Sequence, residues 1–238
     1  MKIGLSYAMT TEIESILRAT GAKELETVCG VPFYEIEEDI IAYAGGIGKV
    51  NAAMAAQLLI DRYRPDWILN AGVAGSFLDV PIGTILVADA FLQHDVDTSP
   101  IGDPVGYVST VNTLRFPAVS EPVCRCLSAL GIPHITGTVA TGDAFMVRGE
   151  RSDWIARTFS PTLCEMEGGA VAQVCLRNGV AFSAMKSVSD RLCSENSPAE
   201  YFSFAEAMER LNEAVLPVAR MLRDAKSAVI NTTGTGEE

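Results

Sequence analysis

The chain has 238 residues, of which 48% are hydrophobic and 20% are charged, a composition typical of a folded globular protein and not of a disordered one. Its 30 acidic and 18 basic residues give a formal net charge of -12, which argues against a surface for nucleic acid or for an anionic membrane. The length suits one large α/β domain, and the charge leaves room for a small neutral or cationic substrate.

The six cysteines are scattered through apolar contexts, and we interpret them as reduced thiols of a cytoplasmic protein. The Cys124-Arg125-Cys126 pair does not have a zinc spacing. The N-terminus runs directly into a predicted strand, so we expect no targeting segment. No apolar run approaches the roughly 18 residues needed to span a bilayer, so we expect no membrane partner.

The first predicted strand covers residues 2–8, and the helix after it begins near Thr10 and Thr11 with Glu12 in its first turn. Glu12 would then lie at the carboxyl end of a strand, where open α/β sheets bind their ligands. The simpler interpretation is that Glu12 only complements the helix dipole. Residues 31–44 follow and predict a hairpin of two strands, 31–37 and 39–44.

A glycine turn at residues 45–48 precedes an alanine-rich helix over residues 52–63. Such a turn exposes backbone N–H groups that can cradle an anion. Its spacing matches neither a Walker loop nor a dinucleotide-binding fingerprint, and tight helix–strand packing explains the glycines equally well. The short strand predicted at residues 67–70 is followed by small residues, 71–76, which would let a ligand approach the backbone closely.

The next predicted strand, residues 84–90, ends near His94, Asp95 and Asp97. These three side chains match no defined metal spacing, so we expect no metal. Residues 98–117 show no clear periodicity and are long for a connecting loop, which predicts a lid or a partner contact.

Phe145 and Met146 are apolar residues that follow the strand predicted over residues 135–140. A helix is predicted over residues 122–130 and a strand over residues 135–140. Phe145 comes soon after that strand ends, where it could stack on a flat ligand. The alternative is that Phe145 and Met146 are core residues.

Three acidic residues mark the stretch from residue 163 to residue 191, which follows a short helix predicted over residues 149–159. The stretch is predicted to form an acidic loop with Glu165 and Glu167, a helix, and a short apolar strand that ends at Ser189 and Asp190. Such a crowd of carboxylates is costly unless ligands, partners or shifted pKa values relieve it.

The last predicted element is a long amphipathic helix over residues 202–225, interrupted at Pro217. Residues 226–238 are predicted to be a disordered tail, which leaves one domain over residues 1–225.

The alternation of strands and helices predicts a single-domain, three-layer α/β/α fold around a central mixed, largely parallel twisted sheet, with antiparallel pairing at the 31–44 hairpin. Polar or glycine-rich segments fall at several strand ends, so one cleft is expected. With no sensible histidine partner for a catalytic triad and no GxSxG elbow, the candidate reagents are carboxylates. Carboxylates suit cleavage of a glycosidic bond, whose oxocarbenium-like transition state gains from nearby anions.

Seven short motifs together resemble the 5'-methylthioadenosine/S-adenosylhomocysteine nucleosidases of the purine nucleoside phosphorylase superfamily. They are AMTTE (8–12), GGIGKVNAA (45–53), NAGVAGS (70–76), QHDVD (93–97), TGDAF (141–145), EMEGGAVA (165–172) and SVSD (187–190). The resemblance extends from residue 1 to about residue 222. It implies a nucleoside phosphorylase-like fold and irreversible hydrolysis of the N-glycosidic bond of both nucleosides to adenine and the 5-thioribose product, with no cofactor and no metal.

The resemblance also implies catalytic roles. Glu12 would act as the general base that activates water, and Asp190, hydrogen-bonded near Ser189, would protonate ring nitrogen 7 of the departing adenine. Asp190 must therefore hold a proton, which a crowded and partly dry site favours. Glu167 would accept hydrogen bonds from the ribose hydroxyls, and Met166 would lie against the sugar.

The remaining implied roles concern binding of the base and of the 5' group. Phe145 would stack on the purine, the Met146 backbone would read its edge, and Gly75 would contribute backbone near the nucleoside. The pocket for the 5'-alkylthio group would be apolar and shared between subunits, formed by Ile47, Phe204 and Ile101 of the partner subunit. The resemblance thus implies a homodimer in which residues 98–117 contribute to the partner's site.

Lys186 departs from the family pattern, because many relatives have there an arginine that orients the attacking water. Lysine keeps the charge but lacks the planar fork of arginine. Three alternatives therefore stay open: hydrolysis of another purine nucleoside such as aminodeoxyfutalosine or futalosine, a phosphate-dependent phosphorylase, and a nucleoside-binding protein without catalysis.

Overall fold

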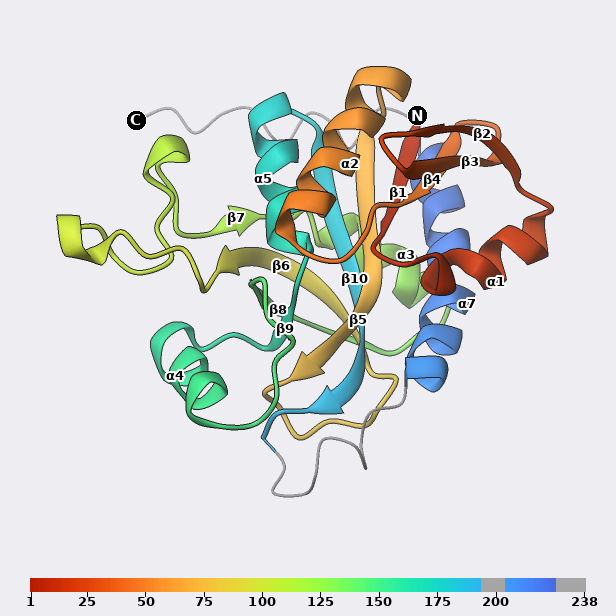
Figure 1. Cartoon of the computed structure of the whole chain (residues 1–238). Coiled ribbons are helices and arrows are strands. Elements are labelled where there is room, and N and C mark those ends of the chain that lie inside the picture. The colour runs from red at the N-terminus through yellow and green to blue at the C-terminus, as the bar shows by residue number, and fades with distance from the viewer. Residues whose placement is uncertain (194–203, 226–238) are drawn as a thin grey trace.

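A mixed sheet of ten strands forms the centre of the molecule in the computed structural model, which describes residues 1–193 and 204–225 (Figure 1). The strands are β1 (Ile3–Tyr7), β2 (Lys23–Val28), β3 (Val31–Glu37), β4 (Ile40–Ala44), β5 (Trp67–Ser76), β6 (Ile85–Gln93), β7 (Phe116–Pro117), β8 (His134–Thr141), β9 (Leu163–Glu165) and β10 (Ala181–Arg191). Their order is β10-β6-β8-β9-β5-β1-β4-β3-β2, and β7 pairs with β6. Because β10 also pairs with β5, the strands β10, β6, β8, β9 and β5 close into a ring.

Helices cover both faces of this sheet, which confirms the predicted three-layer α/β/α fold. The helices are α1 (Thr10–Thr20), α2 (Lys49–Tyr63), α3 (Glu121–Ala129), α4 (Glu150–Phe159), α5 (Gly168–Asn178) and α7 (Phe204–Asp224). Helices α2 and α5 pack against each other on one face, and α1, α3 and α7 pack together on the other (Figure 1). Each face has its own buried apolar cluster, and a smaller third cluster lies where α4 meets β8 and β9.

Parallel pairing dominates where the site lies. Strand β1 runs parallel to both β4 and β5, and β10 runs parallel to β5. The predicted hairpin is confirmed as the antiparallel pair β3–β4. The sheet has more antiparallel pairs than this predicted hairpin. The further antiparallel pairs are β2–β3, β5–β9, β6–β7 and β10–β6.

Several strand boundaries differ from the prediction. The small residues 71–76 do not follow a strand but complete it, since β5 continues to Ser76. Strand β10 is 11 residues long and not short, and β9 forms where an acidic loop was predicted. The edge strand β2 was missed because its sequence, KELETV, is charged and largely exposed, so it lacks the apolar alternation of a strand with one buried face.

The predicted interruption at Pro217 is wrong, because α7 continues through it from Phe204 to Asp224. Apolar side chains on both sides of the proline, such as Leu211, Val215 and Leu222, are buried against the sheet and the neighbouring helices. Their burial, at ~1.5–3 kcal/mol for each large side chain, exceeds the ~3 kcal/mol that an internal proline costs. Residues 226–238, predicted to be a disordered tail, lie outside the described residues.

The segment predicted as a lid or partner contact, residues 98–117, contains two short 3-10 helices, η1 (Ser99–Ile101) and η2 (Ser109–Val111), before it joins the sheet as β7. Figure 1 shows this yellow-green segment projecting away from the body of the molecule. Among the described residues, no helix is long and apolar enough to cross a membrane.

Candidate active site

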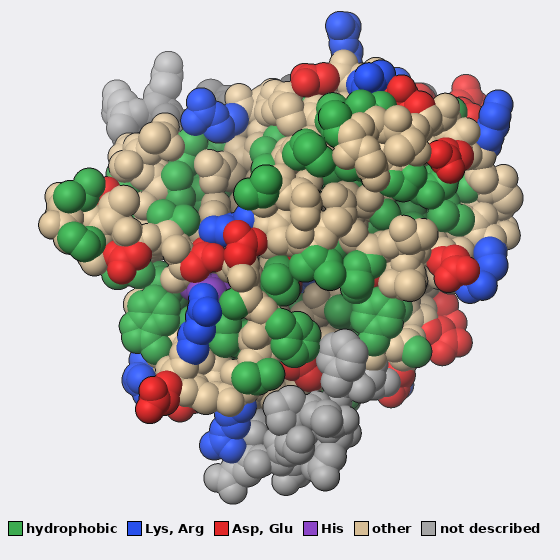
Figure 2. Space-filling model, viewed as in Figure 1, with side chains coloured by type: hydrophobic (Ala, Val, Ile, Leu, Met, Phe, Trp, Pro, Cys, Tyr) green, Lys and Arg blue, Asp and Glu red, His purple; other side chains and the backbone are tan. Residues whose placement is uncertain are grey.

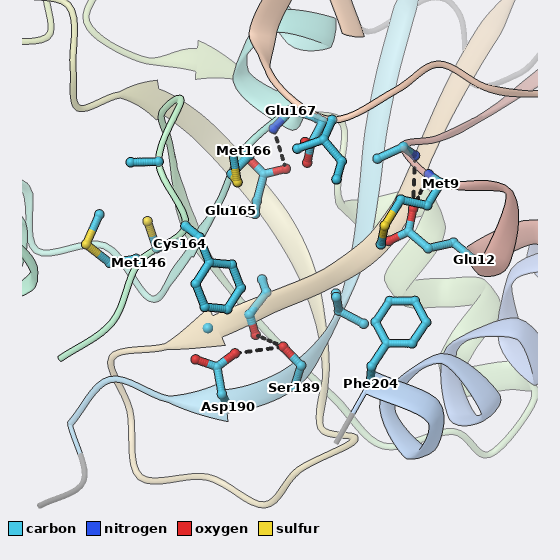
Figure 3. Close-up of a pocket in the computed structure, with 17 residues that line it drawn as sticks. Met9, Glu12, Met146, Cys164, Glu165, Met166, Glu167, Ser189, Asp190 and Phe204 are labelled. Carbon is cyan, nitrogen blue, oxygen red and sulfur yellow. Dashed lines mark hydrogen bonds between the residues drawn. The ribbon is translucent and has the colours of Figure 1, made fainter. Parts of the chain in front are cut away.

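A cavity of about 270 Å³ opens at the carboxyl ends of β1, β5 and β10, beside the end of β9 (Figure 3). Ten of the eleven predicted site residues line it: Glu12, Ile47, Gly75, Phe145, Met146, Met166, Glu167, Ser189, Asp190 and Phe204. The exception is Ile101, which lies in η1 with 83% of its surface exposed. One chain therefore brings together every predicted site residue except the one expected to serve a partner subunit.

Glu12 is held at the start of α1 by backbone N–H groups. Its Oε2 accepts hydrogen bonds from the N–H groups of Ala8 and Met9, both at 3.0 Å, so the carboxylate does cap the helix as the simpler interpretation predicted. The side chain nevertheless lines the cavity and is only 3% exposed. Burial raises the pKa of Glu12, while the backbone N–H groups and the charge of Lys186 partly offset it.

A β-bulge aims Asp190 into the cavity. Val188 pairs with Ala74 and Asp190 with Gly75, so Ser189 is an extra residue in β10 at this point. The Ser189 hydroxyl donates to Asp190 Oδ1 at 2.8 Å (Figure 3). The other oxygen, Oδ2, lies only 3.0 Å from where a Cβ on Gly75 would be, so a side chain at this position would crowd Asp190.

Asp190 is arranged to retain a proton. Burial raises the pKa of its carboxyl, and the hydrogen bond from Ser189 only partly offsets this. Because Ser189 bonds to Oδ1, Oδ2 is the oxygen that this hydroxyl leaves unbonded.

Glu167 is the N-cap residue of α5, but its side chain does not cap that helix. Instead, its Oε1 accepts a 2.8 Å hydrogen bond from the N–H of Gly48, at the N-terminus of α2. The glycine turn before α2 therefore binds a carboxyl group, and this group belongs to a side chain of the same protein. Burial, and next the charge of Glu165, raise the pKa of Glu167 to about 7.

Glu165 caps α5 with its side chain in place of the N-cap residue Glu167. Its Oε2 accepts from the N–H of Gly168 at 2.7 Å, and its Oε1 accepts from the Thr141 hydroxyl. The same Oε2 lies 2.9 Å from Nζ of Lys186, and both side chains are almost fully buried. This buried ion pair secures the start of α5 and leaves the carboxylate of Glu167 to face the cavity.

Lys186, where many relatives have an arginine, holds Glu165. Its ammonium group is bonded to Glu165, and Lys186 is not among the described residues that line the cavity. The Lys186 ammonium group and the Glu12 carboxylate lie on either side of Gly72, which has no side chain. A Cβ on Gly72 would lie 3.1 Å from Glu12 Oε1 and 3.6 Å from Lys186 Nζ. The charge of Lys186 acts on Glu12 across this gap.

The loop after β8 forms one wall. Phe145 lines the cavity with 65% of its surface exposed, while Met146 is 8% exposed and belongs to the third apolar cluster. Met146 is therefore a core residue, as the alternative interpretation predicted, whereas Phe145 is not. Cys164 lines the same wall, and burial raises the pKa of its thiol to about 12, so it stays a neutral thiol.

Apolar side chains also line the cavity. Ile47, in the glycine turn, and Phe204, the first residue of α7, line it together with Met9 and Val73. Phe204 lies next to Met9 and Glu12 in Figure 3. Met9 and Val73 were not predicted as site residues, although both fall inside motifs at strand ends, which is the signal that could have identified them.

His94 and Asp95, where we expected no metal, contact neighbouring segments of the chain. Asp95 accepts a hydrogen bond from Lys49 Nζ at 2.6 Å, and His94 is buried and packs against Gly142. Among residues 1–193 and 204–225, no three His, Cys, Asp or Glu side chains are grouped in a way that could hold a metal ion.

Comparison with known proteins places this site in a family. Residues 2–225 match the model of the phosphorylase superfamily. A 5'-methylthioadenosine/S-adenosylhomocysteine nucleosidase of Shewanella sp. (strain W3-18-1) is 35% identical over 213 residues, which cover 86% of this chain and 91% of that protein.

Two solved structures are similar throughout. A 5'-methylthioadenosine/S-adenosylhomocysteine nucleosidase from Colwellia psychrerythraea, solved in complex with adenine, is 31% identical with a TM-score of 0.82, and the match covers 93% of this chain and 96% of that one. A futalosine hydrolase of Helicobacter pylori is 27% identical with a TM-score of 0.79, and the match covers 94% of this chain and 96% of that one.

Proposed function

The chain belongs to the phosphorylase superfamily and, within it, to the 5'-methylthioadenosine/S-adenosylhomocysteine nucleosidases, and we propose from this premise that it hydrolyses the N-glycosidic bond of both nucleosides. The products are adenine and the corresponding 5-thioribose. The reaction uses water, without cofactor or metal. We also propose a role in methionine salvage and nucleoside catabolism, in the cytoplasm.

The observation that carries this proposal is the charge of the cavity lining. Four carboxylates, Glu12, Glu165, Glu167 and Asp190, line it, and no lysine or arginine does so among the described residues. Cleavage of an N-glycosidic bond builds positive charge on the sugar, which nearby carboxylates stabilise. A phosphate dianion would find no cationic partner among these described lining residues.

The roles that we propose divide these carboxylates by position. Glu12 takes a proton from the attacking water, and its raised pKa makes it a stronger base than an ordinary glutamate. Asp190 gives its proton to nitrogen 7 of adenine from Oδ2, so that the base leaves as a neutral molecule. Glu167, held by Gly48, accepts hydrogen bonds from the ribose hydroxyls.

The rest of the cavity would bind the two ends of the nucleoside. Phe145 stacks on the purine, the Met146 backbone reads its edge, and Gly75 leaves room beside the base. Met166 lies against the sugar. Ile47 and Phe204 form the apolar end for the 5'-alkylthio group.

A phosphorylase is disfavoured because both lysines that could have bound phosphate are engaged by carboxylates. Lys49 Nζ bonds to Asp95 at 2.6 Å, and Lys186 Nζ bonds to Glu165 at 2.9 Å. Releasing either ammonium group would leave its carboxylate without that partner, which is costly for the buried Glu165.

Adenine release from purified protein tests the proposal. We expect release from both methylthioadenosine and adenosylhomocysteine in phosphate-free buffer, at a rate that added phosphate does not change. Strict dependence on phosphate would establish a phosphorylase. Ligand binding without any adenine release by the wild type, together with normal binding by Asp190→Asn, would establish a binding protein without catalysis.

Hydrolysis of futalosine or aminodeoxyfutalosine is a second candidate, favoured by the similarity to the Helicobacter pylori futalosine hydrolase. The same carboxylates would serve it, since the bond to be cleaved is of the same kind. A panel of nucleosides compared by kcat/KM separates the two candidates. A higher value for futalosine than for methylthioadenosine would favour the second.

We also propose that the enzyme is a homodimer, in which Ile101 of the partner subunit completes the apolar end of the site. Ile101 is highly exposed on a segment that projects from the body, and Val50 and Met54 of α2 are exposed as well. Figure 2 shows hydrophobic side chains in broad patches on this face, whereas charged ones are scattered and form no continuous basic field. Light scattering of wild type and Ile101→Asp tests this: a monomeric wild type would contradict it.

A further inference from the structure

Three residues that do not line the cavity form a closed ring of polar contacts near it. Lys49 Nζ donates to Asp95 Oδ1 at 2.6 Å, and the N–H of Asp143 donates to Asp95 Oδ2 at 2.8 Å. The N–H of Lys49 then donates to Asp143 Oδ1 at 2.7 Å, which closes the ring. We name Lys49, Asp95 and Asp143 the polar ring.

The polar ring joins three segments that are far apart in the sequence. Lys49 is the first residue of α2, Asp95 follows the end of β6, and Asp143 is in the loop after β8. Asp95 is the centre of the ring, because each of its two oxygens binds a different segment. Since the side chains of Lys49 and Asp95 are only 17% and 20% exposed, their ion pair is shielded from water more than a typical surface pair.

Two parts of the site lie next to the polar ring in the chain. On one side, Gly48 precedes Lys49 and donates to Glu167. On the other side, Phe145 follows Asp143 by two residues, in the wall of the cavity. The two sides also meet directly, because a Cβ on Gly48 would lie 3.1 Å from Asp143 Oδ1.

We propose that Asp95 is a positioning residue for purine binding, which holds the loop of Phe145 against the start of α2 through Asp143. Phe145 comes two residues after Asp143, so the backbone position that the polar ring fixes affects where the Phe145 ring lies. Without Asp95, the N–H of Asp143 loses its acceptor and Lys49 loses its counter-charge. The loop then samples positions in which Phe145 no longer faces the base. Ligand binding must then order the loop, which weakens the affinity.

The charge of Asp95 is maintained by its partners. Burial acts to raise the pKa of its carboxyl, but the Lys49 ammonium group and the N–H of Asp143 outweigh it and leave the pKa below the ordinary value. The carboxylate is therefore ionised over the whole range in which the enzyme would be assayed.

The decisive variant is Asp95→Asn, which keeps the size but removes the charge that faces Lys49 and leaves one acceptor oxygen for two donors, Lys49 Nζ and the N–H of Asp143. We expect KM for the nucleoside and Kd for adenine to rise about tenfold, with kcat within about twofold of wild type, because Glu12 and Asp190 are untouched. Lys49→Met removes the same ion pair from the other side and should give the same pattern. Glu121→Gln, which removes the exposed Glu121–Arg125 pair on α3, is the matched control and should change neither constant.

Hydrogen exchange of the unliganded protein gives a second readout that does not require activity. The amides of residues 142–149 should exchange faster in Asp95→Asn than in wild type and in Glu121→Gln. Unchanged exchange there, or a loss in kcat with KM and the adenine Kd unchanged, would overturn the proposal.

The assignment rests on the proposed function only in naming the purine as the ligand. A wild type that released no adenine would refute the proposed function, whereas the exchange of residues 142–149 and the binding of adenine would still test the role of Asp95.

Discussion

Replacing Glu167 with glutamine should stabilise the fold at alkaline pH while it impairs activity. The pKa of this carboxyl rises from 4.5 to about 7 because of burial and the neighbouring charge of Glu165. Each pKa unit corresponds to ~1.4 kcal/mol, so the ionised group costs the folded state up to ~3 kcal/mol. Glutamine removes this charge and keeps an oxygen that can accept the N–H of Gly48.

The sign of the pH dependence follows from the direction of the pKa shift. The folded-state pKa is raised, so the stability associated with protonated Glu167 is fully present below about pH 4.5 and is lost as the pH rises through about 7. At about pH 8.5, Glu167→Gln should be more stable than wild type by ~1–3 kcal/mol, the lower value applying if the side chain relaxes toward water. At about pH 5 the difference should fall below ~1 kcal/mol.

Urea unfolding at the two pH values, with equal m-values, measures this difference. Glu37→Gln is a control of opposite sign, because Arg220 and Arg223 lower the pKa of Glu37 and its ionised form is therefore the favoured one. That variant should be less stable than wild type at alkaline pH. If Glu167→Gln were the less stable variant at both pH values, the carboxylate would be a stabilising group and the reasoning above would be refuted.

Three further changes test individual contacts. Asp190→Asn should lower kcat by about 10²–10⁴-fold as expected for loss of a general acid, and near-normal turnover would refute its role. Lys186→Met should destabilise the protein by ~3–5 kcal/mol in urea unfolding, because it leaves Glu165 buried and unpaired, whereas a loss below ~1 kcal/mol would mean that this carboxylate readily finds another partner. Gly75→Ala places a Cβ 3.0 Å from Asp190 Oδ2 and should lower kcat by displacing the Asp190 carboxyl. A crystal structure of the variant in which Asp190 has not moved would contradict this explanation.

The sequence predicts the layers of this fold because local patterns determine them. Alternating apolar strands and amphipathic helices identify the α/β/α arrangement, and the turn before α2 is visible as a run of glycines. The positions of Glu12 and Asp190 at strand ends follow from the same patterns, since parallel strands present their carboxyl ends at one edge of a sheet.

The sequence does not predict contacts that depend on register. The extra residue Ser189 in β10, which turns Asp190 toward the cavity, is defined only by the pairing with β5. The pairing of Lys186 with Glu165 links residues 21 positions apart, and no local pattern distinguishes it from a lysine that faces the substrate. The strand β9 is three residues long, too short for its periodicity to be recognised.

The identity of the sugar product formed in the presence of saturating phosphate tests the central claim most directly. The cavity has four carboxylates and no basic side chain in its described lining, which favours water over phosphate as the nucleophile. Mass spectrometry of the products from methylthioadenosine should then detect adenine and free 5-methylthioribose, with no sugar phosphate. A 5-methylthioribose 1-phosphate product would contradict the account.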